Sequence, residues 1–168
     1  MSGAADGARA AGGRGDAPVA EVLDAVARAG DAQAGLDAVV RAFAADTGTL
    51  HFLGSDGLLH LAALHGTLPP PVLEQVRRIP VGKGMAGACA EQDAPVTWCN
   101  LAQDGSGTVR PAARSTGMAG SIVVPVRAGG RMVGTLGVAN AAERTFTDAE
   151  TASLLACAAS LARFRPAG

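Results

Sequence analysis

Cysteine is the first residue type in this 168-residue sequence that could carry chemistry, as a nucleophile, a redox centre or a metal ligand. The three cysteines are Cys89, Cys99 and Cys157, and no two of them have C-x-x-C spacing. Their odd number and spacing argue against a disulfide framework or a cysteine-rich zinc site. Cys99, beside Trp98, is the cysteine whose reactivity we would test, whereas the other two lie among small apolar residues that predict burial.

Histidine is the second candidate, because haem binding needs an axial imidazole and acid–base chemistry uses the same ring. His51, His60 and His65 all lie in or next to one predicted hairpin. A histidine in a hairpin is more typical of the surface or of a hydrogen-bonded core position. We therefore expect structural roles for all three.

A glycine-rich turn at residues 82–87, Gly-Lys-Gly-Met-Ala-Gly, matches the dinucleotide-binding pattern G-x-G-x-x-G. That function requires a preceding strand within a βαβ unit. Residues 73–78 instead have a helical pattern, and the neighbouring strands are predicted as hairpins. We expect the glycines instead to permit positive φ in a tight turn. The turn leads into a short helix, whose N-terminus attracts anions weakly.

Composition excludes several classes of partner. The chain has 14 basic against 15 acidic residues, 3% aromatics and no tyrosine. It therefore lacks the excess of positive charge and the stacking aromatic residues that are typical of nucleic-acid binding. We also expect no membrane contact, since no apolar run reaches the ~18–20 residues of a span. The N-terminus lacks a signal peptide, so a cytoplasmic location is expected. Residues 1–16 contain no large apolar side chain after Met1 and are predicted to be disordered, and 166–168 form a short tail.

Hydrophobic periodicity predicts the elements that position these residues. Asp31 is expected to cap the second helix and Gly48 to end it, while Thr147 and Glu150 form a capping-box pattern. The strands pair as hairpins, which predicts an α+β domain with an antiparallel sheet and helices on one side. The predicted order begins with helices at 18–29 and 32–47, a hairpin at 49–66, and helices at 69–78 and 84–92. It continues with a strand at 94–100, a polar loop at 101–118, a hairpin at 121–140 and a helix at 147–165.

Three segments in this order resemble the GAF family of sensory domains: residues 36–66, 79–101 and 121–150. The resemblance implies a GAF (PAS-like) fold for residues 17–165. It implies a five- or six-stranded antiparallel sheet with helices packed on its faces. One face would carry a small-molecule pocket roofed by the short helices and the long loop. The first and last helices would pack on the other face, where many members of the family dimerise.

Free methionine-(R)-sulfoxide reductase, an enzyme of the family, resembles this sequence locally. The resemblance places its catalytic cysteines at Ala86 and about Arg114, and its acidic residues near Ser121, Gly137 and Ala139. None of these side chains can supply the thiol attack and resolution. We therefore expect no enzymatic activity.

Other ligand signatures of the family are incomplete. Asn140 and Phe146, followed by Asp148 and Glu150, match parts of the cyclic-nucleotide signature, but Ala141 stands where the family has lysine. The bilin signature is missing because no histidine follows residue 65. No cofactor is identified by the sequence.

A generic pocket remains. Trp98 is expected to form its wall or to fill the core, with these alternatives left open. Arg110 and Arg114 are expected either to clamp a carboxylate or phosphate or to remain solvated. The full set of expected ligand-binding residues is Trp98, Asn100, Arg110, Arg114, Ser115, Thr116, Met118 and Ser121.

The function that these residues favour is non-catalytic sensing of an unidentified small molecule, with signalling to a separate protein partner. The alternative is a dimerisation or protein-interaction module with a vestigial ligand pocket. In either case we expect a homodimer through helices 18–29 and 147–165.

Overall fold

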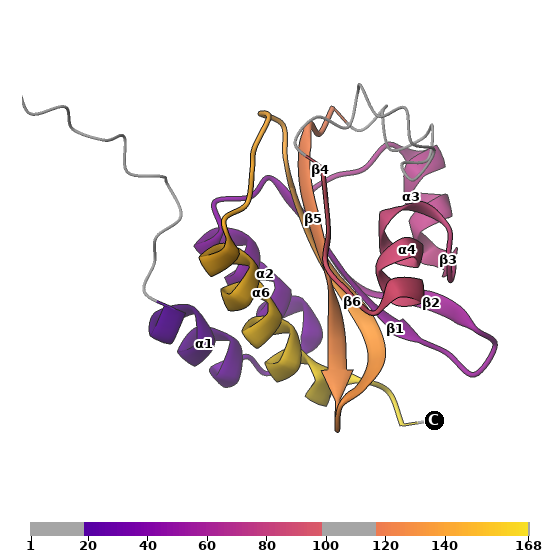
Figure 1. The fold of residues 1–168 in the computed structure, drawn as a ribbon, viewed down its shortest axis with the longest axis horizontal. Coiled ribbons are helices and arrows are strands. Elements are labelled where there is room, and N and C mark those ends of the chain that lie inside the picture. Colours follow the sequence, from indigo (N-terminus) through magenta and orange to yellow (C-terminus); the bar gives the residue numbers. More distant parts are fainter. Residues whose placement is uncertain (1–18, 99–116, 168) are drawn as a thin grey trace, which may run out of the picture.

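The computed structural model describes residues 19–98 and 117–167. A six-stranded antiparallel sheet in the order β3-β2-β1-β6-β5-β4 lies between two layers of helices (Figure 1). The α+β prediction and the expected number of strands are confirmed. The strands are β1 (Thr47–Leu53), β2 (Leu58–His65), β3 (Arg78–Pro80), β4 (Val96–Trp98), β5 (Gly120–Ala128) and β6 (Arg131–Asn140).

One face of the sheet is covered by α1 (Val19–Arg28), α2 (Ala32–Ala42) and α6 (Asp148–Leu161) (Figure 1). Asp31 caps α2 by accepting a hydrogen bond from the Ala34 amide, as predicted. Thr147 and Glu150 form the expected capping box at the start of α6. These caps satisfy amides that a helix leaves unpaired in its first turn.

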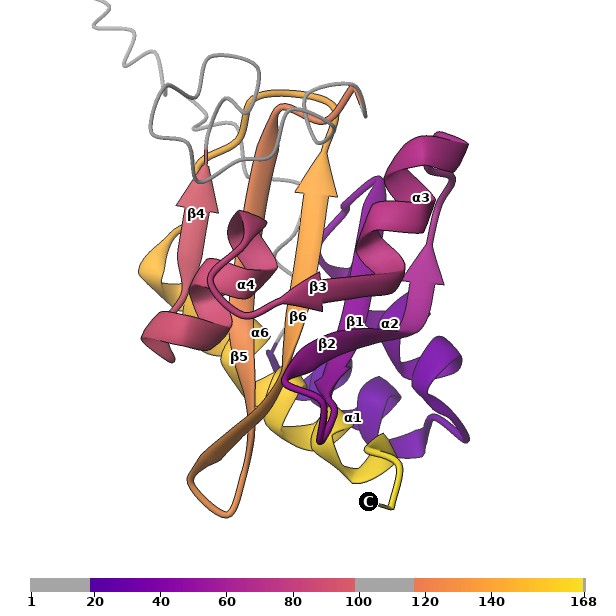
Figure 2. The same cartoon turned by 90° about the vertical axis from the view of Figure 1, so that its right-hand side faces the viewer.

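The hairpin pattern by itself predicts helices on one side of the sheet, which is wrong, whereas the helices on both faces implied by the resemblance are confirmed. Figure 2 shows α3 (Pro70–Arg77), β3 and α4 (Gly84–Gln92) in front of the opposite face. The central strands explain the difference, because β5 is buried at seven consecutive positions, Gly120–Val126. A strand buried on both faces must be covered from both sides.

The main core lies between the sheet and the helix layer α1–α2–α6. Leu36, Leu50, Leu136, Leu154 and Leu161 are all 0% exposed there. A smaller cluster on the opposite face joins Leu59, Ile79 and Ala90. Most of the large apolar side chains are therefore used on one face.

Two predicted boundaries are wrong. Gly48 does not end the second helix but lies in β1, where an added Cβ would collide with the Val40 side chain. The glycine therefore lets α2 pack closely on the strand. Residue 78 leaves the predicted helix and begins β3, which pairs with β2 through Arg78–His60. Both features depend on contacts distant in sequence, so local periodicity does not reveal them.

Other predictions depend on which residues the structure describes. The strand predicted at 94–100 is present as Val96–Trp98, and its last two residues lie outside the described part. The predicted tail 1–16 also lies outside it. No helix within the described residues is long and apolar enough to cross a membrane.

Candidate functional site

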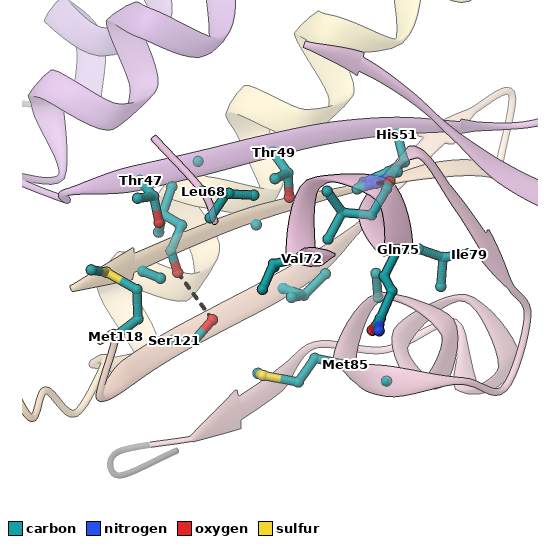
Figure 3. A pocket seen from close by; sticks show the side chains of 18 of the residues that line it. Thr47, Thr49, His51, Leu68, Val72, Gln75, Ile79, Met85, Met118 and Ser121 are labelled. Carbon is teal, nitrogen blue, oxygen red and sulfur yellow. Dashed lines mark hydrogen bonds between the residues drawn. The ribbon is translucent and has the colours of Figure 1, made fainter. Parts of the chain in front are cut away.

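A cavity of about 170 Å³ lies between the sheet and the layer formed by α3 and α4 (Figure 3). Its floor comes from β1, β5 and β6, and its roof from residues 68–86. The described residues that line it are Thr47, Gly48, Thr49, His51, Leu68, Val72, Gln75, Val76, Ile79, Lys83, Gly84, Met85, Ala86, Met118, Ser121, Val123, Gly137, Val138 and Ala139.

The floor is recessed because β6 carries Gly137 and Ala139 where larger side chains would fill the space. A Cβ on Gly137 would lie 3.3 Å from Val123 Cγ2 and 3.4 Å from Thr49 Oγ1. Even a methyl group would therefore be a tight contact. The absence of side-chain atoms at this position helps to make the cavity.

The glycine-rich turn forms part of the roof. Gly82 and Gly84 have positive φ values of 89° and 62°, which confirms the tight turn predicted from the sequence. Lys83 stands at the N-cap of α4, and Gly84, Met85 and Ala86 begin the helix. β3 does precede this turn, but it pairs antiparallel with β2. The βαβ unit of a dinucleotide site is therefore not formed here.

His51 is the buried polar residue of the cavity, with 1% of its surface exposed. Its Nε2–H donates to the Val76 carbonyl at 2.7 Å, which leaves Nδ1 as an acceptor. Burial lowers the pKa of His51 to about 4, so the ring is neutral at neutral pH. Among the described residues, neither His51 Nδ1 nor Oγ1 of its cross-strand neighbour Thr135 has a hydrogen-bond partner.

The three histidines thus differ. His60 bonds to Asp56 and His65 to Asp37 on partly exposed surfaces, as expected of structural residues. His51 is hydrogen-bonded on one side only, and it lines the cavity. Its burial and its bond to Val76 agree with the hydrogen-bonded core position expected of a structural histidine, but no side chain in the described part of the molecule pairs with Nδ1.

Of the residues predicted to bind a ligand, Met118 and Ser121 line the cavity. Trp98 is half-buried on β4 opposite Ser121, outside the lining set, and its indole N–H has no partner among the described residues. The role of all these residues in binding stays a prediction. The others lie outside the described part: Asn100, Arg110, Arg114, Ser115 and Thr116.

Sequence reasoning missed the β1 residues of the floor, although a signal existed. Thr47, Thr49 and His51 alternate with the apolar residues Leu50 and Phe52 along one strand. Alternation of this kind marks one apolar and one polar face. The roof residues left no such signal, because their contact with the sheet depends on the path of the chain.

The described positions at which the sequence resemblance places the reductase's functional groups lie in this cavity. Ala86, Ser121, Gly137 and Ala139 all line it, while Arg114 lies outside the described residues. The Ser121 hydroxyl donates to the Val138 carbonyl at 3.3 Å, so this hydrogen bond does not pair it with a base.

The two described cysteines lie elsewhere and are buried. Burial raises the pKa of Cys89 to about 12 and that of Cys157 to about 11, which suppresses the thiolate. Cys99, the cysteine singled out for a test of reactivity, lies outside the described residues. The described part of the chain holds no group of three or more His, Cys, Asp or Glu residues that could bind a metal.

The residues that match the cyclic-nucleotide signature have structural contacts. The Asn140 amide donates to the Ala44 carbonyl, and Arg144 pairs with Glu150 at 2.8 Å. The Arg144 guanidinium also stacks over the Phe146 ring, 4.6 Å from its centre. These contacts join the end of β6 to α6 on the helix side of the sheet.

Comparison with known proteins identifies the fold. A family model described as GAF domain matches residues 19–164. Free methionine-R-sulfoxide reductase from Neisseria meningitidis, solved with its substrate, is 22% identical with a TM-score of 0.70, over 87% of this chain and 85% of that chain.

Two further solved structures are GAF domains of phosphoenolpyruvate-protein phosphotransferases. The Acinetobacter domain is 18% identical with a TM-score of 0.69, over 87% of this chain and 89% of its own. The Coxiella burnetii domain is 21% identical with a TM-score of 0.69, over 86% and 88%. None of the curated proteins compared matches the chain. At these identities the structural likeness establishes the fold alone.

Proposed function

Because this chain belongs to the GAF domain family, whose members generally mediate sensing or regulation, we propose that it is a non-catalytic small-molecule sensor. The cavity beneath α3 and α4 is the binding site in this proposal, and the output passes to a separate protein. The observation that carries the proposal is the cavity itself: an apolar space with a few polar groups, recessed at Gly137 and Ala139.

A catalytic role is disfavoured by the chemistry of the lining. No cysteine, aspartate or glutamate belongs to the described lining residues. His51 donates to a backbone carbonyl, and so does Ser121, so these contacts form no nucleophile–base pair. The small side chains at the reductase's catalytic positions support the same proposal.

The helix layer is the proposed route of output and the proposed homodimer surface. α1 is the outermost helix (Figure 1), and Val19 on it is 46% exposed. Arg163 donates to the carbonyls of Val26, Ala27 and Ala29, which fastens the end of α1 to the segment following α6. A dimerisation or protein-interaction module with a vestigial pocket would use the same surface.

Native mass spectrometry of the purified full chain tests these alternatives together. A bound small molecule, or a rise of the thermal midpoint with a cyclic nucleotide, amino acid, 2-oxoacid or tetrapyrrole, is expected for a sensor. A ligand-free dimer with no thermal shift would replace the sensor with the interaction module. If the chain reduces free methionine sulfoxide and Cys99→Ser abolishes this turnover, the protein is an enzyme and the sensor proposal is wrong.

A further inference from the structure

We propose that the cavity binds a small aliphatic carboxylate that carries a hydrogen-bond donor at its far end. The carboxylate would lie at the N-terminus of α4 beside Lys83, and the donor on His51 Nδ1. The hydrocarbon body would lie between them, against Val72 and Met85, which Figure 3 shows with His51. This inference rests on the proposed function, since it names the ligand class of the same cavity.

The charge of the lining favours an anion. Lys83, the single lysine of the sequence, is the one cation among the described lining residues, which include no carboxylate. Gly84, Met85 and Ala86 line the cavity and form the first turn of α4, whose amides have no partners within the helix. These N–H groups and the helix dipole favour negative charge at the same end.

The size and polarity of the cavity limit the rest of the ligand. Its volume of about 170 Å³ is smaller than the ~300–1,000 Å³ of pockets for drug-sized ligands, so a nucleotide is disfavoured. A zwitterionic amino acid would bury its ammonium group against described lining residues that include no carboxylate. Val72, Met85 and Val123 instead offer contacts to a hydrocarbon chain.

His51 defines the other polar end. Its Nε2–H is used by the Val76 carbonyl, so the unpaired Nδ1 accepts a hydrogen bond and does not donate one. Leaving a buried acceptor unpaired is unfavourable, because it has lost its bond to water without gaining another. An O–H or N–H of the ligand would satisfy it. A buried water shared with Thr135 would do so equally well, and the experiment separates these two cases.

Three probes of similar length isolate the features: 6-hydroxyhexanoate has both polar ends, hexanoate lacks the donor and 1,6-hexanediol lacks the charge. We expect calorimetry on the full chain to show binding of 6-hydroxyhexanoate. Hexanoate should bind about tenfold more weakly, the effect of one hydrogen bond. The diol should not bind measurably.

Variants locate each end. Lys83→Met should weaken both acids about tenfold, as loss of one charge-assisted contact predicts, and Lys83→Arg should retain most of the affinity. Arg78→Met is the matched control, because Arg78 is exposed on the neighbouring β3 and does not line the cavity. The ¹⁵N resonance of His51 Nδ1 should move on addition of 6-hydroxyhexanoate and not of hexanoate.

The outcomes distinguish this inference from the proposed function. Equal binding of the diol and the acids, or no effect of Lys83→Met, would exclude the carboxylate. If the two acids bind with equal affinity and the Nδ1 resonance does not move, a buried water and not the ligand pairs with His51 Nδ1. If a neutral or cationic molecule copurifies with the wild type and is absent from Ala139→Val, the proposed carboxylate is wrong but the proposed sensor function stands. The absence of any bound molecule, together with no binding of any probe, would overturn both.

Discussion

The two faces of the sheet are built from the same strands and have opposite character. Along β6, Leu136 and Val138 point to the helix layer and are buried in the main core. Their neighbours Gly137 and Ala139 point to the other face and leave a cavity. Successive side chains of a strand point to opposite faces, so one sequence segment specifies both a packed core and an open space.

β1 repeats this division with polar residues in place of small ones. Leu50 and Phe52 belong to the main core, whereas Thr49 and His51 line the cavity. Large apolar side chains give the helix face its stability, and small or polar ones give the other face room and hydrogen-bonding groups. We therefore expect stability to depend mainly on the helix face and binding on the cavity face.

Neighbouring residues on β6 test this division most strongly. Leu136→Ala should lower the free energy of unfolding by about 2–5 kcal/mol, because it opens a void in a closely packed core. Gly137→Ala, one residue along, should change it by less than about 1 kcal/mol, since the added methyl only tightens contacts at the cavity floor. Urea denaturation measures both. Equal losses would mean that the two faces contribute alike.

The buried histidine gives the cavity face a stability effect that depends on pH. Burial lowers the pKa of His51 from the ordinary histidine value of 6.5 to about 4 in the folded chain. As the pH falls from 6.5 to 4, the unfolded chain takes up a proton that the folded chain does not, and stability decreases. The loss should reach about 3 kcal/mol at pH 4 and be absent above pH 7.

The histidine effect is measured as the pH dependence of urea unfolding in the wild type and in His51→Gln. Their difference should shrink steadily as the pH falls to 4. His60→Gln makes the same chemical change at a partly exposed site and is the matched control. The pKa values of Asp37 and Glu150 are lowered in the folded chain, so protonation of these carboxylates decreases the stability of all three proteins at still lower pH. Parallel curves for wild type and His51→Gln would show that His51 is not buried neutral.

The helix face was largely predictable from the sequence. Its caps at Asp31 and Thr147, and the buried stripe through Leu154, Cys157 and Leu161, follow from local spacing and helical periodicity. These signals are local, and the helix itself supplies the geometry that joins them.

The cavity was only partly predictable. The family resemblance placed Ala86, Gly137 and Ala139 at functional positions, and all three line the cavity. The resemblance also implied a roof of short helices, but not which of their residues line the cavity, because that depends on how α3 and α4 approach the sheet. β3 has only three residues, too few for a hydrophobic period to be recognised. Which nitrogen of His51 donates and which accepts a hydrogen bond depends on the Val76 carbonyl, which belongs to another element.

The smallest expected change in stability belongs to a variant that should abolish binding. Ala139→Val adds two methyl groups to the cavity floor at a β-strand position, and should change the free energy of unfolding by less than about 1 kcal/mol. It should also remove the thermal shift produced by 6-hydroxyhexanoate. Ala62→Val on the exposed side of β2 is the matched control and should keep that shift. Retained binding in Ala139→Val would place the ligand elsewhere, because a valine side chain and a ligand cannot share so small a space.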